Sequence, residues 1–155
     1  MARNGECRAG FSLVEMVFVL AILGVITSIA VPRFAQFQAR RRVESAARRI
    51  ATDLSLAQRY ARFMSKSQTV KFNAGPDRYH LLGIGNPNGS GPNYTVHLGS
   101  EPYLASMVSA DFGGDTDLVF DGYGIPDSGG TVVVQVGSLQ KSVVVNATTG
   151  AASIP

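Results

Sequence analysis

The positions of hydrophobic and polar residues divide the chain into three stretches. The first, residues 11–31, carries Glu15 as its only charge. A helix needs about 20 apolar residues to cross the hydrocarbon core of a bilayer, whereas the apolar region of a secretory signal has about 7 to 15. The length of this stretch therefore predicts a membrane-spanning helix over residues 11–31.

The second stretch, residues 32–63, has apolar residues at steps of three and four, which is the spacing of one helix face. The apolar stripe consists of Ala39, Val43, Ala46, Ile50, Leu54, Ala57 and Ala61, and the other faces carry Arg40, Arg41, Arg48, Arg49, Arg59 and Arg62. Pro32 lacks a backbone N–H and predicts a kink at the membrane boundary, after which the helix resumes. Such an amphipathic helix needs a sheet to cover its stripe.

The third stretch, residues 64–155, consists of short strand-like runs separated by Gly and Pro turns. Strands are predicted at residues 68–73, 78–84, 94–98, 118–120, 131–136 and 139–146. Gly75-Pro76-Asp77 and Gly137-Ser138 predict hairpin turns, residues 85–92 predict a loop, and Thr149-Gly150 leads into a short final segment. Antiparallel strands packed on a long N-terminal helix give an α+β fold.

The modest net charge of +3 hides a strong asymmetry along the chain. Residues 33–71 hold ten Lys and Arg against two acids, whereas residues 72–155 hold two basic residues against seven acids. Charged residues make up 16% of the chain, below the roughly 25% of an ordinary soluble domain. These features argue against a plain soluble enzyme. The single cysteine, Cys7, excludes a disulfide framework and a cysteine-based zinc site.

Glu15 is the most informative residue of the apolar stretch. A carboxylate inside an apolar helix costs roughly 2.5–3.5 kcal/mol on insertion scales, so it needs a partner. One interpretation is that Glu15 lies near the membrane interface and extends into the headgroup layer. The other is that a cation lies nearby, either a new α-amino group released at Phe11 by cleavage after Gly10 or the amino group of a neighbouring copy.

The segment from Gly10 to Phe34, GFSLVEMVFVLAILGVITSIAVPRF, closely resembles the N-terminus of type IV pilins and type II secretion pseudopilins. The resemblance implies that residues 1–10 are a leader, that prepilin peptidase cuts between Gly10 and Phe11, and that it N-methylates Phe11. It also implies that Glu15 docks the subunit in register against a neighbour's amino terminus in a helical filament. Pro32 matches the position where the family's helix is interrupted.

The C-terminal part resembles the GspH/FimT branch of this family, the minor pseudopilin H-like proteins, in residues 53–62, 119–126 and 143–150. The branch implies a low-abundance subunit at or near the filament tip. We therefore expect a minor pseudopilin of a type II protein secretion system, whose partners are other pseudopilins or pilins and the secretion machinery. The alternative is a FimT-like minor type IV pilin for pilus assembly or DNA uptake. DNA-binding members have a basic motif near the C-terminus, but residues 149–155 contain no arginine.

Two features leave other locations open. Ser28-Ile29-Ala30 resembles a signal-peptidase site, which would give a secreted protein beginning at Val31. The arginines that follow the apolar stretch outnumber Arg3 and Arg8 before it, and the positive-inside bias would then leave the C-terminal domain in the cytoplasm. Because the pilin resemblance is more specific, we expect a bacterial inner-membrane protein with a single span and a periplasmic C-terminal domain.

The arginine-rich helix also raises the question of nucleic acid. No aromatic residues interleave residues 40–49 as a base-stacking platform would require. We therefore expect these arginines to form a solvated face or to pair with acids of neighbouring subunits, and we expect no nucleic-acid partner.

The sequence offers little for catalysis or metal binding. His80 and His97 are the only imidazoles and lie in strand-like runs, and no hydrolase, zinc or phosphate-loop motif is present, so we expect no enzyme. Five acids between residues 111 and 127 could suit calcium, but their spacing does not match an EF-hand. We expect solvated acidic loops, no metal and no other cofactor.

Overall fold

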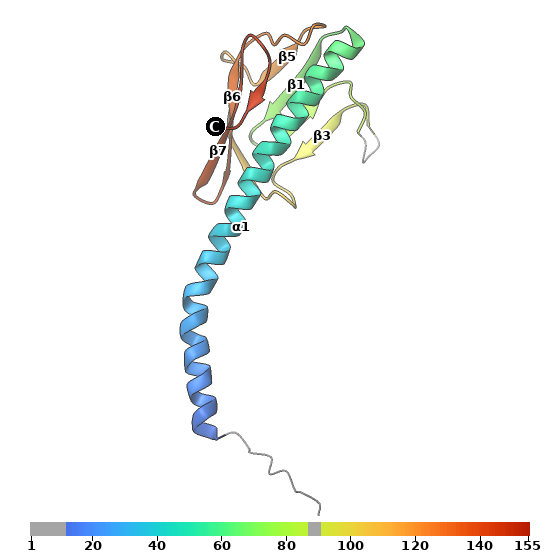
Figure 1. The fold of residues 1–155 in the computed structure, drawn as a ribbon. Coiled ribbons are helices and arrows are strands. Elements are labelled where there is room, and N and C mark those ends of the chain that lie inside the picture. The colour runs from blue at the N-terminus through green and yellow to red at the C-terminus, as the bar shows by residue number, and fades with distance from the viewer. Residues whose placement is uncertain (1–11, 87–90) are drawn as a thin grey trace, which may run out of the picture. The chain divides into compact units, whose positions relative to one another are not determined.

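The structure is a computed structural model that describes residues 12–86 and 91–155. One long helix precedes all the strands (Figure 1). The elements are α1 (Leu13–Met64), β1 (Gln68–Asn73), β2 (Arg78–Leu81), β3 (Tyr94–His97), β4 (Ser106–Asp111), β5 (Asp117–Phe120), β6 (Gly130–Val136), β7 (Leu139–Val145) and β8 (Ala152–Ser153). The predicted α+β class, a long apolar N-terminal helix followed by antiparallel strands, is confirmed.

Two compact units divide the chain between Phe37 and Gln38, within α1. The first unit consists, among the described residues, of the apolar part of α1. The helix assignment continues through Pro32, so the missing N–H of proline does not end the helix. The kink at Pro32 and the domain limits given above remain predictions.

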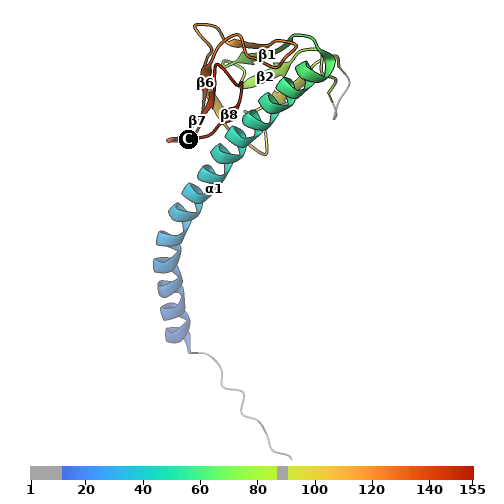
Figure 2. The same cartoon turned by 45° about the horizontal axis from the view of Figure 1, so that its top comes forward.

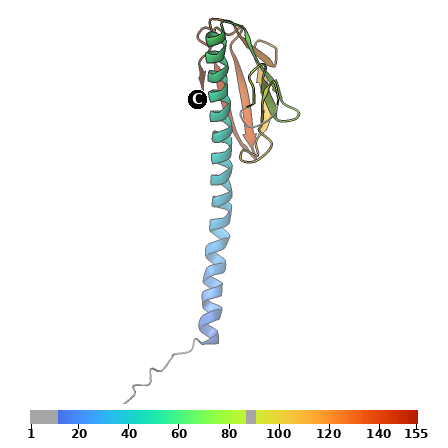
Figure 3. The same cartoon turned by 90° about the vertical axis from the view of Figure 1, so that its right-hand side faces the viewer.

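The second unit, Gln38–Pro155, contains the amphipathic part of α1 and every strand. The predicted stripe is buried there, because six of its seven residues are at most 2% exposed. These six are Val43, Ala46, Ile50, Leu54, Ala57 and Ala61. Ala39, at the start of the stripe, is only partly buried. In Figure 3 most of the strands lie beside one face of the amphipathic part of α1.

The strands form two four-stranded sheets rather than one. The first has the order β3-β2-β1-β5 and the second the order β4-β6-β7-β8, and every pairing is antiparallel. Figure 2 shows β1 and β2 of one sheet, and β6, β7 and β8 of the other, around the same part of α1. The two predicted hairpins are confirmed, since Asn73 pairs with Arg78 and Val136 with Leu139.

The predicted strands differ from the observed ones at β2, β4 and β8, and the sequence predicts only a short final segment where β8 forms. Strand β2 ends at Leu81, three residues before the predicted end, because the chain turns at Gly83, whose φ is +73°. Strand β4 was not predicted at all. Its burial does not alternate, and its pairing with β6 shifts between Met107 and Ser109, so no period-2 pattern marks it in the sequence.

The two sheets are joined through aromatic and polar contacts. The ring of Phe72 in β1 lies 5.5 Å from that of Tyr79 in β2 and 5.4 Å from that of Phe112, which follows β4. Asp77, in the β1–β2 turn, accepts a hydrogen bond from the Met107 N–H on its carboxylate and one from the Leu98 N–H on its carbonyl, both at 2.7 Å. One hairpin turn of the first sheet therefore anchors the start of the second.

A buried glutamine connects α1 to both sheets. The Gln58 side-chain amide donates to the Gly124 carbonyl at 2.8 Å and to the Thr149 carbonyl at 2.6 Å. Gly124 follows β5 of the first sheet, and Thr149 lies between β7 and β8 of the second. Gly150 has φ of +68°, and a Cβ there would lie 2.5 Å from Gln58 Nε2, so only glycine fits beside this amide.

A buried carboxylate forms a second polar contact between α1 and the first sheet. Asp53 is 3% exposed, and its Oδ2 accepts hydrogen bonds from the Tyr79 hydroxyl at 2.6 Å and from Arg49 Nε at 3.0 Å. The Arg49 guanidinium also lies 5.6 Å from the centre of the Tyr94 ring. The prediction that Arg49 belongs to a solvated face is therefore wrong, because Asp53 and Tyr94 draw it against the sheet.

Burial raises the pKa of the Asp53 carboxyl, and the hydrogen bond from Tyr79 and the charge of Arg49 oppose this shift only in part. The folded chain therefore binds this proton at a higher pH than the unfolded chain does. The stabilisation from protonated Asp53 is complete below the ordinary value of 3.8 and is lost as the pH rises through the folded value.

Replacing Gln58 with Leu should lower the free energy of unfolding by about 1–3 kcal/mol for each carbonyl left without its donor. Gln58→Glu should destabilise more, because a carboxylate would face the same two carbonyl oxygens. Urea unfolding of the full chain in detergent micelles, followed by circular dichroism, measures the change. Gln38→Leu makes the same replacement at an exposed position of α1. A Gln58→Leu chain as stable as this control would contradict the bridging role.

Asp53→Asn should remove the proton linkage at this position. The unfolding free energy of the parent chain, measured relative to that of Asp53→Asn, should rise as the pH falls from 7 toward 3.8, because the folded parent takes up the proton first. The measurement is a series of urea titrations of both chains at several pH values. A difference that stays constant, or that falls as the pH falls, would contradict the raised pKa.

Candidate functional site

The N-terminal part of α1 presents an unusually exposed apolar surface. Every large apolar side chain from Leu13 to Ile26 is between 49% and 80% exposed. The mean hydropathy of an 18-residue window is 2.5 and none of it is buried, so α1 is long and apolar enough to cross a membrane. An apolar surface of this extent needs lipid or other helices around it.

Two hydroxyl groups within this surface are satisfied by the helix itself. Thr27 Oγ1 donates to the Leu23 carbonyl at 2.8 Å, and Ser28 Oγ donates to the Val25 carbonyl at 2.7 Å. Such bonds to the preceding turn keep the hydroxyls paired where no water is available. These polar residues therefore do not interrupt the apolar surface of α1. Ser28, part of the possible signal-peptidase site, lies inside the helix.

Glu15 lies in the first turn of α1, near the start of the run of exposed apolar residues. An acid in a first turn interacts favourably with the helix dipole, by about 0.3–1 kcal/mol. This is less than the cost of placing a carboxylate in an apolar medium. Within residues 12–86 and 91–155, no ion pair satisfies Glu15. The helix therefore presents one charge that lacks a cationic partner in this part of the chain.

Of the other predicted residues of this site, the structure describes only Pro32. Gly10 and Phe11, the predicted cleavage and methylation positions, lie outside the described residues. Pro32 lies within α1. The structure therefore describes Glu15 and its helix, while processing at Gly10 and Phe11 stays a prediction.

The two histidines are ordinary strand residues, as predicted. His80 lies in β2 opposite Thr95, and its Nδ1 is 2.8 Å from the Thr95 hydroxyl. His97 in β3 pairs with Arg78. Partial burial lowers the pKa of His80, and the charges of Arg78 and His97 add to the effect. Neither imidazole contacts a carboxylate and a nucleophile together among the described residues.

The acidic residues between positions 111 and 127 serve mainly to close turns. Asp121 Oδ1, for example, accepts the N–H of Tyr123 at 2.9 Å and that of Ile125 at 2.8 Å. Asp117 instead forms a 3.0 Å ion pair with Lys71. No group of three or more His, Cys, Asp or Glu side chains in the described part of the chain could hold a metal ion.

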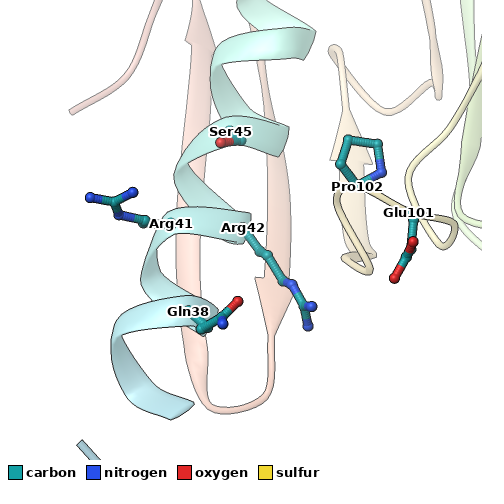
Figure 4. Close-up of a pocket in the computed structure, with 6 residues that line it drawn as sticks. All are labelled: Gln38, Arg41, Arg42, Ser45, Glu101 and Pro102. Atoms are coloured by element: carbon teal, nitrogen blue, oxygen red, sulfur yellow. The ribbon is translucent and has the colours of Figure 1, made fainter. Parts of the chain in front are cut away.

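One feature of the second unit was not predicted from the sequence. Gln38, Arg41, Arg42 and Ser45 of α1 line a cavity with Glu101 and Pro102, which lie between β3 and β4 (Figure 4). The spacing of the four helix residues marks one face, but nothing in the sequence indicates that the Glu101-Pro102 loop lies against it. Only the fold brings these residues together.

Comparison with known proteins identifies the N-terminal segment. Residues 7–31 match the prokaryotic N-terminal methylation motif. The chain is also similar to the type IV major pilin protein PilA of Myxococcus xanthus (strain DK1622), with 42% identity over 40 residues, or 26% of this chain. The match spans only 18% of that pilin's length. No solved structure matches the chain significantly.

The motif match covers the segment that holds Glu15 and the exposed apolar helix. A single N-terminal apolar helix with this motif is consistent with anchoring in the inner membrane. The described strands add the antiparallel sheets of a pilin-like architecture. The chain is therefore a type IV pilin-like protein with a prokaryotic N-terminal methylation motif.

Proposed function

We propose that the protein is a non-enzymatic subunit of a pilin-like filament, anchored in the inner membrane before assembly. The observation that carries the proposal is the exposed apolar surface of α1, in which Glu15 is the only charge. In a bilayer this surface is solvated by lipid, and in a filament it is covered by the same helix of neighbouring subunits. The same apolar surface of α1 can therefore be covered both in the membrane and in the filament.

Glu15 sets the register of the proposed filament. Prepilin peptidase removes residues 1–10 and methylates the new amino group of Phe11. That cationic amino group on a neighbouring subunit pairs with the Glu15 carboxylate, which removes the cost of an unpaired charge in an apolar bundle. The pairing takes place only at one axial offset between two helices, so it selects that offset from many packings of similar apolar area.

The finer assignment is a minor pseudopilin of a type II secretion system, at or near the pseudopilus tip, with a periplasmic C-terminal domain. Its support is that the three segments resembling the GspH/FimT branch meet in space. Gln58 of residues 53–62 donates to Gly124 of residues 119–126 and to Thr149 of residues 143–150. Because the three segments meet at one buried amide, they form one structural unit. Their resemblance to the branch is therefore less readily explained as three independent chance similarities.

The alternative is a minor type IV pilin for pilus assembly or DNA uptake, which the similarity to the Myxococcus pilin favours. The C-terminal residues 149–155 contain no arginine, which weighs against DNA uptake. Secretion genes or pilus genes beside this one would separate the two functions. Salt-dependent binding of DNA by the full chain would favour the pilus version.

The proposed processing fixes the residue at which the mature chain begins. Mass spectrometry of the chain purified from a cell that expresses prepilin peptidase should find a species that begins at Phe11 and carries one added methyl group. Gly10→Val should abolish this species, because the residue before the cut would become bulky and β-branched. A chain that begins at Val31 would contradict the proposal and identify a secreted protein instead.

Glu15 should be needed for incorporation into filaments and not for processing. Glu15→Ala should leave cleavage and membrane insertion intact, since the substitution makes the helix more apolar, but should lower incorporation into filaments at least about tenfold for a lost charge pair. Immunoblots of sheared filament fractions and of membranes give the two amounts. Met16→Ala changes the adjacent exposed residue without altering charge. Equal incorporation of Glu15→Ala and Met16→Ala would refute the role in register.

A further inference from the structure

The last turn of α1 and the turn that packs on it expose four large apolar side chains. Phe63 is 83% exposed and Met64 44%, while Tyr123 is 82% and Ile125 49% exposed. Exposed apolar residues gathered in one place mark interaction sites. Aromatic residues and methionine are also enriched at the centres of protein interfaces. These four residues are called the cap surface below.

The backbone that carries the cap surface is fixed on the end of α1. Arg62 Nε donates a hydrogen bond to the Tyr123 carbonyl at 3.0 Å. A Cβ at Gly124 would overlap the Arg62 side chain, and one at Gly122 would lie 3.0 Å from the carbonyl carbon of Ser65. The turn and the helix end are therefore in direct contact. Binding through the cap surface would need little ordering of the backbone, which lowers the cost of association.

A second exposed surface lies at the other end of the same unit. Glu101, Pro102 and Leu104, between β3 and β4, are all exposed and are called the loop surface below. Glu101 and Pro102 line one cavity with Arg42, so this loop lies beside the start of the helix in the second unit (Figure 4). Arg42 and Arg62 are roughly 30 Å apart along the helix at 1.5 Å per residue. The loop surface and the cap surface therefore lie at opposite ends of the second unit.

The loop surface presents an apolar side chain from a costly backbone conformation. Leu104 has φ of +46°, which is rare for a bulky residue, and it is 42% exposed. The N–H groups of Tyr103 and Leu104 both donate to the Ser100 carbonyl, at 3.1 and 3.0 Å, and the Ala105 N–H donates to the Leu98 carbonyl at 2.9 Å. These bonds hold Leu104 in place. Conformational costs of this kind are typical of functional sites.

The two surfaces carry opposite charges. Arg59 and Arg62 in the last two turns of α1 and Lys66 just after it are all exposed. Asp121, the one acid of residues 121–125, is engaged by the N–H groups of its own turn. Glu101 is the only charged residue between β3 and β4, and it forms no ion pair with any other residue that the structure describes. Each surface therefore combines apolar side chains with a charge that complements the other.

We propose that the cap surface of one copy binds the loop surface of a second copy. Phe63 and Tyr123 pack against Leu104 in this contact, and a cation at the end of α1 lies beside Glu101. The inference rests on the proposed filament, because two copies must lie in succession along it. Since the two surfaces differ, the contact is heterologous, and each copy keeps one surface free for a further copy.

The observations favour a second copy over other partners. The two surfaces lie at opposite ends of one helical segment, so a shift along α1 brings the loop surface of one copy toward the cap surface of another with their helices parallel. A detergent or lipid surface would cover the cap surface without using Glu101. Exposed rings beside cations also suit single-stranded nucleic acid, but that partner would use neither Glu101 nor Leu104.

Cross-linking tests which surfaces of two copies meet. Two full chains with different tags, both with Cys7→Ser, are expressed in one cell, one with Phe63→Cys and the other with Leu104→Cys. A short bismaleimide should join the two tags in sheared filaments. Thr52→Cys, at an exposed position halfway along the helix of the second unit, replaces Phe63→Cys in the control and should give little mixed product.

Other products of the same reaction would overturn the proposal. Two Phe63→Cys copies that join as readily as the unlike pair would show a two-fold contact instead of a heterologous one. A different protein joined to Phe63→Cys in place of the second copy would show another occupant. Loss of the mixed product after nuclease treatment would place nucleic acid between the copies.

Exchanging the charges tests the same contact without cysteine. Lys66→Glu and Glu101→Lys each bring like charges together between copies, so each should lower incorporation into filaments at least about fivefold. The chain with both substitutions should regain most of the loss, because the pair is restored with its signs reversed. A misfolded chain cannot produce this recovery. The proposal is overturned if neither single change lowers incorporation, or if the double variant incorporates no better than the single ones.

The same filament samples separate this inference from the proposed function. A parent chain that is present in sheared filaments, with no mixed product from the Phe63→Cys and Leu104→Cys pair, overturns the contact between the two surfaces alone. A parent chain that is absent from filaments overturns the proposed filament subunit, and the contact fails with it.

Discussion

The Gln58 side-chain amide is a single donor group that connects α1 to segments of both sheets. It binds a carbonyl after β5 of the first sheet and a carbonyl between β7 and β8 of the second. Apolar packing of alanines against strands is not directional and would tolerate small shifts of either sheet. Two hydrogen bonds from one planar group do not tolerate such shifts, because moving either sheet leaves a buried polar atom unpaired.

The alanine-rich stripe and the buried polar groups of α1 have complementary effects. Ala46, Ala57 and Ala61 are fully buried, so the helix backbone approaches the strands closely. The close approach buries Asp53 and brings it within hydrogen-bond distance of Tyr79. The small side chains thus let α1 lie close to the strands, and the hydrogen bonds of Asp53 and Gln58 fix how α1 is oriented against them. In the first unit, by contrast, the large apolar side chains from Leu13 to Ile26 are exposed.

Local periodicity predicted most of the fold. The long helix, its buried stripe and six strands followed from patterns that repeat every two or every three to four residues, and both hairpins followed from short Gly-containing turns. Strand β4 and the division into two sheets could not be predicted in this way. A bulge between Met107 and Ser109 removes the period, and strand order depends on pairings between residues far apart in the chain.

Only the part of the candidate site that depends on local sequence could be predicted. Glu15 stands out because one acid in an apolar stretch is visible in the sequence alone. The place of Arg49 was missed although Asp53 lies four residues farther along the same helix, because Tyr94 meets Arg49 only after the helix has packed on β3. The cavity at Arg42 was missed for a similar reason, since Glu101 lies 59 positions farther along the chain.

The inward hydrogen bonds of Thr27 and Ser28 have a consequence for how the subunit would enter and leave a filament. Because both hydroxyls are already paired within their own helix, exchanging lipid neighbours for protein neighbours breaks no hydrogen bond and forms none along this part of α1. The balance between the dispersed and the assembled subunit then depends, in this part of α1, on close packing and on Glu15 alone.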